Sequence, residues 1–464
     1  MTDPQPSLII HVPPGFTAAK SYAIDVVFNR ILQVRYEQRA STAAHYRLDV
    51  GNQQIVLADV LLKHTADALF VTDLTPTHAL ASFPIPAALH DAGDGPATVP
   101  VLFGEPNLRT GENGIECDID IFGSVFFMLS RYEELTSPVR DTHERFPAAA
   151  SLAAKEGFLD RPIVNEYAML LWGMIKSLRP SSSRPYKAGQ FRITCDVDHP
   201  FDPIRSQLKL AGRSAAADIV KRRSVASGLR RIGGFLSHTL GRHDGDPNYT
   251  FDWYARVCAD ANKSATFYFI PDHTAGTLDG YYDLYDRRVI QLIRYLANEG
   301  HSIGTHGSYH SFRNALQIRN ERQRMQAACQ KAAITSDVAG NRQHYLRWDA
   351  RETADHLDAA GYEYDSTGGY ADAPGFRFGT AHAFPMWSWQ KNAPLGLIQR
   401  PLILMDTTLL STEYLGLETP GQMLRLAQKL AARTLSSGGD FTILWHNSNL
   451  KTADTRQLFQ SIIH

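Results

Sequence analysis

The sequence predicts an α/β protein, a deformed (β/α) barrel of about seven strands that follows a smaller α+β domain. Three observations lead to this expectation. The 464 residues exceed the size of one ordinary core. A segment rich in Pro and Ser, 178–189, separates two parts of the chain. Beyond it, short apolar runs alternate with helical patterns, which is typical of a parallel sheet.

The first part, 1–180, is expected to be an α+β domain of unknown role. Apolar and β-branched runs predict its strands at 8–12, 23–28, 54–62 and 68–74. Apolar residues at helical spacing predict its helices at 120–135 and 164–178.

The second part, 187–464, is expected to be the barrel domain. Strands are predicted at 191–195, 264–270, 301–305, 344–347, 362–364, 402–405 and 441–445. Helices are predicted at 287–298, 315–334, 352–360 and 420–433, and Gly300 and Gly361 cap two of them. Polar residues follow several strands, which favours a barrel over an open sheet, with the active site on that face.

The composition is that of a globular protein, with 44% hydrophobic and 20% charged residues. The net charge of −1 gives no reason to expect nucleic acid as a partner. The four cysteines show neither a disulfide framework nor a zinc-binding spacing. Neither a signal peptide nor a transmembrane segment is apparent, so we expect a cytoplasmic protein that meets precursors rather than finished polymer. The oligomeric state is not predicted.

Two imidazoles and a carboxylate at predicted strand ends indicate a metal site. His306 and His310 are four residues apart, so one helical turn would place both rings on one side. Asp198 supplies a third ligand, and such a set suits zinc, or cobalt or nickel, with one open position. Among 18 histidines this spacing also arises by chance. His199 is a competing ligand.

Asp196 is the expected general base that deprotonates the attacking water, although the roles of Asp196 and Asp198 could be reversed. Alternatively, the segment Asp-Val-Asp-His-Pro at 196–200 is a simple turn. Arg342 is expected to hold the base carboxylate ionised, unless it is a surface arginine. His446 follows an apolar strand and is the expected acid for the leaving group, unless it is a core histidine.

Further strand-end residues are candidates for substrate binding. Asp365 and Asp406 could orient His446, bind substrate or cap a helix. Trp348, with Trp387 and Trp389, could form a wall that stacks on a sugar, and packing in the core is the alternative.

Five segments resemble motifs of the polysaccharide deacetylase family, the NodB-type carbohydrate esterases, in the family's order. They are Ile-Thr-Cys-Asp-Val-Asp-His-Pro at 193–200, Ser-Ala-Thr-Phe-Tyr-Phe-Ile at 264–270, Gly-His-Ser-Ile-Gly-Thr-His-Gly-Ser-Tyr-His at 300–310, Gly-Asn-Arg-Gln-His-Tyr at 340–345 and Leu-Trp-His at 444–446. The pattern resembles a bacterial subgroup in which this domain follows an uncharacterised N-terminal domain. Three positions depart from the family pattern: Val197 separates the two aspartates, His344 replaces a proline, and 364–369 replaces an Asp-Trp motif.

The resemblance implies zinc-dependent removal of an N-acetyl or O-acetyl group from a sugar or glycan precursor. Hydrolysis of a linear or cyclic non-sugar amide on the same fold is an alternative. A catalytically idle domain that binds a glycan or a partner protein is another.

The segment 203–243 is long for a connection between a strand and a helix. It contains nine Lys and Arg residues against one acid, Asp218, with apolar residues interspersed. It could hold the phosphate of a phosphate- or lipid-linked sugar, or make peripheral contact with an anionic membrane. Alternatively, it is a solvated insertion that packs against the N-terminal domain.

Overall fold

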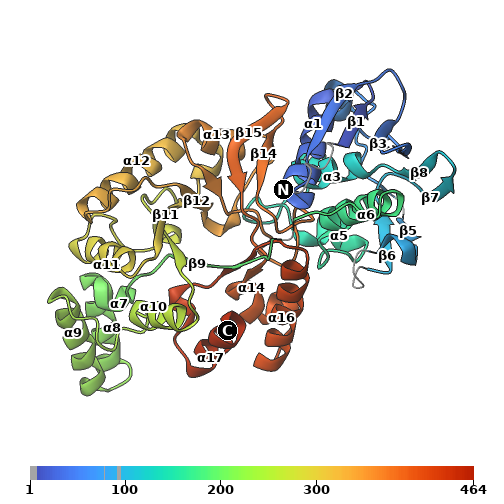
Figure 1. The fold of residues 1–464 in the computed structure, drawn as a ribbon. Coiled ribbons are helices and arrows are strands. Elements are labelled where there is room, and N and C mark those ends of the chain that lie inside the picture. Colours follow the sequence, from blue (N-terminus) through green and yellow to red (C-terminus); the bar gives the residue numbers. More distant parts are fainter. Residues whose placement is uncertain (1–7, 78, 91–95, 186) are drawn as a thin grey trace.

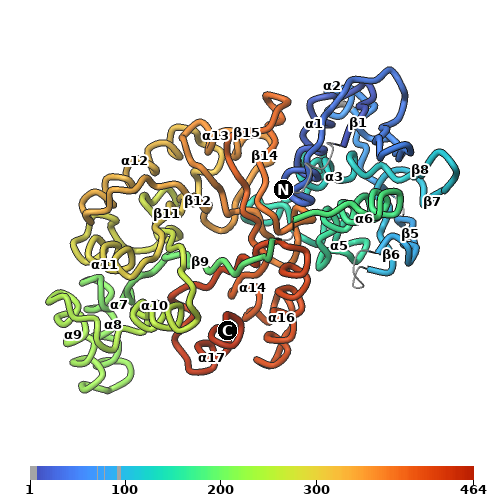
Figure 2. Tube along the Cα trace, in the orientation of Figure 1, coloured from blue at the N-terminus to red at the C-terminus, as the bar shows by residue number. Residues whose placement is uncertain are grey.

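The structure contains two sheets that lie in different parts of the chain. The computed structural model describes residues 8–77, 79–90, 96–185 and 187–464 (Figure 1). A six-stranded sheet is built from strands within residues 8–119, and a nine-stranded sheet from strands within residues 191–444. The trace in Figure 2 shows these two parts side by side, with helices around each. The chain is therefore a mixed α/β protein, as predicted.

The six-stranded sheet is mixed, and helices pack against it. Its order is β2 (Tyr36–Ala40), β1 (Leu8–Val12), β3 (Tyr46–Val50), β4 (Gln53–Leu57), β8 (Gly114–Ile119) and β7 (Gly104–Gly111). A separate pair joins β5 (Ala81–Pro84) and β6 (Thr98–Val101). The helices of this part are α1 (Thr17–Asp25), α2 (Ala66–Val71), α3 (Ile121–Ser130), α4 (Tyr132–Thr136), α5 (Leu152–Lys155) and α6 (Ile163–Leu178). Every residue of α3 is buried, so its apolar sequence reflects packing on all sides.

Two of the predicted N-terminal strands are wrong. The run 23–28 lies in α1 and in a π-helical turn, Val26–Leu32, and the run 68–74 overlaps α2. Val26, Val27 and Phe28 are fully buried, so tertiary packing overrides their preference for a strand. The strand at 8–12 and the helix at 164–178 are confirmed within a residue. The predicted helix at 120–135 is divided into α3 and α4 by Arg131, whose φ is 54°.

The nine-stranded sheet is parallel except at one edge. Its order is β14 (Phe384–Ser388), β15 (Ala393–Gln399), β13 (Tyr364–Asp365), β12 (Gly340–Gln343), β11 (Ser302–Gly307), β10 (Ala265–Phe269), β9 (Phe191–Val197), β17 (Phe441–Leu444) and β16 (Leu404–Met405). Among the described strands of this sheet, only β14 runs antiparallel, in a hairpin with β15 that the sequence did not predict. Among the described residues, no strand pairing joins β14 to β16, so closure into a barrel is not confirmed.

The helices of the second part follow the predicted alternation. They are α7 (Pro203–Ser206), α8 (Leu208–Val220), α9 (Val225–Thr239), α10 (Phe251–Asp260), α11 (Arg287–Asn298), α12 (Ala315–Lys331), α13 (Thr353–Ala360), α14 (Asp406–Leu410), α15 (Thr412–Leu415), α16 (Pro420–Ser436) and α17 (Ala453–Ile463). The predicted strand at 344–347 is wrong, because β12 ends at Gln343 and a 3₁₀ turn follows it. No helix of the described residues is both long and apolar enough to cross a bilayer.

The β14–β15 hairpin joins the two parts of the chain through buried contacts. Trp387 lies 5.7 Å from Phe16 and 5.1 Å from Phe126, measured between ring centroids. The Trp389 indole N–H donates to the backbone oxygen of Ser130 at 2.9 Å. Both tryptophans are buried, so the predicted sugar-stacking wall is wrong for this pair. A domain boundary at 180–187 remains a prediction, since one continuous apolar core includes residues from both parts.

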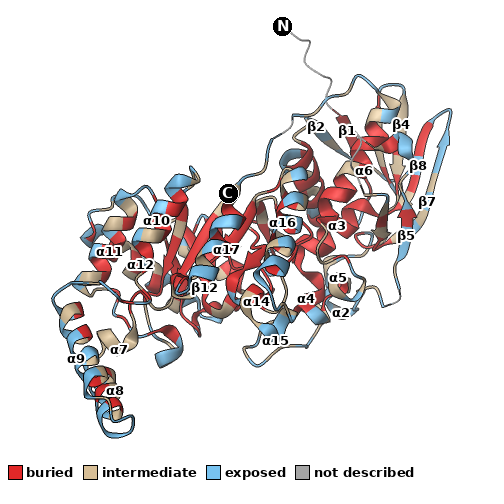
Figure 3. Ribbon diagram, turned by 90° about the horizontal axis from the view of Figure 1, so that it is seen from below, coloured by how far each residue is buried: buried red, intermediate tan, exposed pale blue. Residues whose placement is uncertain are grey.

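Helices α8 and α9 form a hairpin that projects from the molecule. Figures 1 and 3 place it at the end opposite the N-terminal part, so it does not pack against that part. Figure 3 also shows long exposed stretches along α9.

Candidate metal and acid–base site

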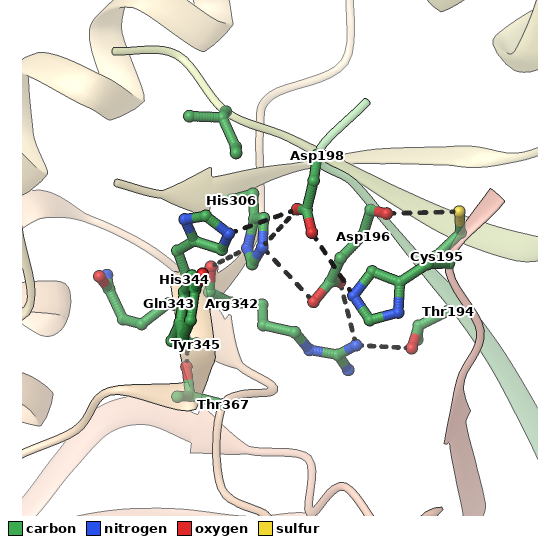
Figure 4. A network of polar contacts seen from close by, with 12 residues as sticks. Thr194, Cys195, Asp196, Asp198, His306, Arg342, Gln343, His344, Tyr345 and Thr367 are labelled. Carbon is green, nitrogen blue, oxygen red and sulfur yellow. Dashed lines mark hydrogen bonds and ion pairs between the residues drawn. The ribbon is translucent and has the colours of Figure 1, made fainter. Parts of the chain in front are cut away.

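Polar side chains at the ends of four strands meet at one edge of the nine-stranded sheet (Figure 4). Asp196 lies in β9 and Asp198 follows it, while His306 lies in β11 and His446 follows β17. Arg342 lies in β12, and His306 is its register partner on β11. Because these strands are parallel, their carboxyl ends lie at the same edge. The predicted site residues on these strands are therefore brought together.

Asp198, His306 and His344 form a group that could hold a metal ion. One ligand atom from each lies within 4.8 Å of the others. The Nε2 atom of His306 is 3.3 Å from Asp198 Oδ1, and that of His344 is 3.6 Å from the same oxygen. Asp198 Oδ1 is buried and has no hydrogen-bond partner among the residues that the structure describes. A buried carboxylate oxygen that faces two imidazole nitrogens fits the donor set of a divalent cation.

Both histidines are oriented by an acceptor on the other ring nitrogen. His306 Nδ1 lies 2.8 Å from the backbone oxygen of Arg342. His344 Nδ1 lies 2.9 Å from Asp279 Oδ1. A proton on each Nδ1 satisfies these acceptors and leaves Nε2 free to bind, which is the usual arrangement around metal ligands.

The structure does not bring His310 into this group, which corrects the predicted ligand set. The segment after His306 is not helical: β11 ends at Gly307, and a 3₁₀ turn begins at Ser311. His310 is exposed, and its Nδ1 lies 3.4 Å from Arg347 Nη1. His344 takes the third place. The sequence feature that could have identified His344 as a ligand is its position at a strand end, two residues after Arg342. His199 also lies outside the group.

Asp196 and Arg342 form a buried pair beside the metal group. Asp196 Oδ1 lies 3.2 Å from Arg342 Nη1, and its Oδ2 lies 3.5 Å from His306 Nε2. The guanidinium also donates to Thr194 Oγ1 at 2.7 Å and to Ser366 Oγ at 2.8 Å. Arg342 is fully buried, so the alternative of a surface arginine is excluded. These contacts fix one carboxylate oxygen of Asp196 and the plane of the guanidinium.

His446 is held by Asp406 and faces the second carboxylate oxygen of Asp198. Its Nδ1 lies 2.7 Å from Asp406 Oδ1, and its Nε2 lies 3.7 Å from Asp198 Oδ2. Asp406 Oδ2 also accepts the His446 backbone N–H at 2.7 Å and Asn449 Nδ2 at 3.0 Å. Burial opposes the charge on His446, but the Asp406 carboxylate, with smaller contributions from Asp198 and Asp196, outweighs burial and raises the pKa of His446 to about 10. Of the roles considered for Asp406, the geometry supports the one that orients His446.

Two predicted substrate-binding residues are buried in the packed interior. Asp365 is fully buried and accepts Thr367 Oγ1 at 2.5 Å and Asn341 Nδ2 at 3.2 Å. Burial raises the pKa of Asp365. Trp348 is 3% exposed and packs edge-on against Phe378, 6.3 Å away. Their positions after strands suggested a site, but both side chains are part of the packed interior.

A loop of the N-terminal part lines the same site, which the sequence did not indicate. His143 Nδ1 lies 2.9 Å from the Tyr309 hydroxyl, and the backbone oxygen of His143 accepts Arg347 Nε at 2.9 Å. Arg145 Nη1 donates to the backbone oxygen of Tyr345 at 3.1 Å. Tyr345 has a φ of 60° and follows His344, so the loop supports an unfavourable backbone conformation next to a proposed ligand.

Comparisons with known proteins identify one family model and several solved structures that each match part of the chain. Residues 8–180 match the model of a family of unknown function, DUF7033. No curated protein matches the chain. Similar solved structures include a Mycobacterium smegmatis protein assigned as a polysaccharide deacetylase, 18% identical with a TM-score of 0.38, covering 61% of this chain and 85% of that one. A family 4 carbohydrate esterase from Streptomyces lividans is 13% identical with a TM-score of 0.28, covering 60% and 87%.

A third similar structure, PuuE allantoinase, is 11% identical with a TM-score of 0.37, and the match covers 61% of this chain and 88% of that one. At identities and TM-scores this low, the similarities carry no function to this chain. Its function is therefore argued from its own site.

Proposed function

We propose that the protein is a metal-dependent hydrolase that removes an N-acetyl or O-acetyl group from a sugar or a glycan precursor. One observation carries the metal dependence: His306 and His344 both direct Nε2 at the unpartnered Oδ1 of Asp198, while their Nδ1 atoms are held by Arg342 O and Asp279. Side-chain packing alone does not require three converging ligand atoms and two imidazoles with fixed tautomers, whereas metal binding does.

The residues present fit a divalent ion. Two imidazoles and one carboxylate suit zinc, and also cobalt or nickel, and leave open positions for water and substrate. The ligands in this proposal are Asp198, His306 and His344. A bound ion would supply Lewis acidity to the oxygen of the acyl group.

Asp196 is the general base in this proposal. It lies outside the group of three, yet its Oδ2 is 3.5 Å from His306 Nε2, so it adjoins the metal ligands. Arg342 Nη1 holds the other oxygen, Oδ1, at 3.2 Å, and a carboxylate positioned in this way can accept a proton from an attacking water.

His446 is the general acid. Asp406 keeps the imidazole protonated and fixes its Nδ1, so Nε2 is the atom that donates a proton to the leaving amine or alcohol. Asp196 and His446 each have their own buried partner, Arg342 for the aspartate and Asp406 for the histidine. A base and an acid that are each fixed by a separate partner suit the two proton transfers of acyl hydrolysis.

The acetylated sugar comes from the motif resemblance rather than from the geometry. Tyr345 is partly buried and lies 4.7 Å from the His344 ring, so it offers an aromatic face next to the proposed ligands. Such a face suits stacking on a sugar ring.

Acetate release tests the proposal. Purified protein supplied with zinc, cobalt or nickel is incubated with N-acetyl and O-acetyl sugars, free and phosphate-linked, and with linear and cyclic amides. We expect acetate from an acetylated sugar and much less release from Asp196→Asn. Cleavage of non-sugar amides alone would replace the proposal with the amide hydrolase. Tight binding of a glycan without any turnover would support an idle binding domain.

A further inference from the structure

Helix α9 carries a continuous apolar stripe that faces solvent. The stripe consists of Val225, Leu229, Ile232, Leu236 and Leu240, whose spacing of three or four residues places them along one side of the helix. Leu229 is 61% exposed, Leu236 54% and Leu240 76%. In an amphipathic helix that packs on a core, the apolar side chains face the protein interior. Here they face solvent, so no described residue covers this stripe.

The packing of the hairpin itself uses a different side of α9. Gly228, Gly234 and His238 are the buried residues of this helix. A Cβ atom at Gly228 would lie 2.6 Å from Ile219 Cγ1 of α8, so the two helices approach closely there. Since α8 already covers that side, the apolar stripe is not an incomplete part of the contact between α8 and α9.

The hairpin that carries the stripe is also rich in positive charge. Exposed basic side chains on and beside the hairpin include Lys209, Arg213, Lys221, Arg223, Arg230 and Arg242. The single acid of the segment 203–243, Asp218, is buried and already pairs with Arg222 at 2.6 Å and Arg231 at 3.2 Å. The hairpin is therefore strongly basic, although the whole chain has a net charge of −1.

We propose that the α8–α9 hairpin docks on an anionic lipid bilayer, with the stripe of α9 inserted at the level of the headgroups. A helix with a basic face and an apolar face lies in the plane of a membrane interface and binds through both kinds of contact. At about 1.5 Å per residue, α9 is long enough to lie along the surface over several headgroups.

Other occupants fit less well. A second copy of this hairpin would bring two strongly basic surfaces together, and their repulsion opposes association. A nucleic acid would satisfy the arginines, but it would leave Leu229, Ile232 and Leu236 without an apolar partner. An anionic membrane satisfies both the charge and the apolar side chains.

The position of the hairpin in the chain indicates which edge of the nine-stranded sheet would face the bilayer. Helix α7 begins at Pro203, shortly after Asp198 at the end of β9, so the hairpin leaves the sheet at the edge that carries the candidate site. A protein docked in this way holds that edge near the bilayer. The inference stands on the hairpin alone and does not depend on the proposed hydrolysis.

Vesicle sedimentation of the full chain tests the proposal. The probes are vesicles of phosphatidylcholine alone and of phosphatidylcholine mixed with phosphatidylglycerol. We expect binding to the mixed vesicles and little binding to the neutral ones. The variant with Leu229→Gln, Ile232→Gln and Leu236→Gln should lose binding, by about tenfold for each side chain that inserts fully. The variant with Lys221→Gln, Arg230→Gln and Arg242→Gln should lose about fivefold per charge, and its residual binding should depend less on salt.

A matched control is Leu316→Gln, because Leu316 is 66% exposed on α12 and lies outside the hairpin. It should bind vesicles like the unmodified protein, and circular dichroism should show all variants folded. Equal binding to both vesicle types, no binding, or unchanged binding of the apolar variant would overturn the proposal. So would sedimentation velocity that shows a dimer of the unmodified protein and a monomer of the apolar variant, because a second copy would then cover the stripe.

Discussion

The carboxylate of Asp279 holds the imidazole of His344, with Oδ1 and Nδ1 2.9 Å apart. Asp279 comes from a loop before α11 and His344 from the end of β12, 65 residues later. Asp279 also accepts the backbone N–H groups of Tyr309 at 2.7 Å and Ala275 at 2.8 Å. It is fully buried, and although burial opposes its charge, its contacts with His344 and these N–H groups lower the pKa of Asp279. This carboxylate therefore fixes the orientation of a proposed metal ligand.

Asp279→Asn should weaken metal binding without removing a ligand. Loss of such an outer-shell carboxylate usually costs about 10- to 100-fold in affinity. Competition with a chromophoric chelator measures the dissociation constant. Asp283→Asn serves as the control, since Asp283 is an exposed acid of the same loop. An unchanged metal affinity in Asp279→Asn would show that His344 does not depend on this contact.

The two aspartates of β9 should differ in what their loss removes. Asp198→Asn should reduce the metal content, because Asp198 is the carboxylate in the group of three. Asp196→Asn should retain the metal and lose most of the turnover, because it removes the base alone. Elemental analysis and acetate release on the same samples separate these effects. If Asp196→Asn loses the metal while Asp198→Asn keeps it, the two roles are reversed.

His446 should set the alkaline limit of activity. Its raised pKa keeps the imidazole protonated at neutral pH, and the acid form is lost as pH rises through that pKa. Asp406→Asn removes the largest attraction on this proton, so the pKa should fall and the alkaline decline of kcat/KM should move to lower pH. His446→Ala should cost about 10²- to 10⁴-fold in kcat. An Asp406→Asn profile that coincides with the unmodified one would contradict this role for the pair.

Arg145 should act as a positioning residue from the N-terminal part. Its guanidinium donates to the backbone oxygen of Tyr345 and lies 2.7 Å from Asp141 Oδ2. Arg145→Ala should lower kcat while the melting temperature stays close to that of the unmodified protein, because the loop, not the core, is released. Arg145→Lys should restore part of the activity. Arg39→Ala provides the control, since Arg39 is exposed and pairs only with its neighbour Glu37 among the described residues. If the metal-loaded Arg145→Ala variant keeps full kcat, the loop has no influence on the site.

The local elements of the second part could be predicted because their signals are local. Helix α11 was predicted with its bounds, since Val289, Ile290, Ile293 and Leu296 lie on one side and Gly300 follows. The strand ends that carry Asp196, His306 and His446 were found for the same reason. Apolar runs that end in polar residues mark the carboxyl edge of a parallel sheet.

The parts that were missed depend on contacts between distant segments. His344 was not predicted as a ligand, because nothing near it in the sequence reveals that Asp279 orients it. Nothing in the sequence around Trp387 and Trp389 indicates that they pack on aromatic side chains of the N-terminal part. His310 was chosen for a helical spacing, and the chain does not continue as a helix after β11. Each of these errors arises where tertiary structure, not local preference, decides the position of a side chain.

The metal content of two single variants tests the central claim most directly. Elemental analysis of the unmodified protein, His344→Ala and His310→Ala, purified together without chelators, compares the two candidate third ligands. We predict one divalent ion per chain in the unmodified protein and in His310→Ala, and a strong reduction in His344→Ala. Retention of the ion by His344→Ala with its loss from His310→Ala would contradict the ligand set, and absence of a stoichiometric ion from all three, even after zinc is added, would contradict the metal site itself.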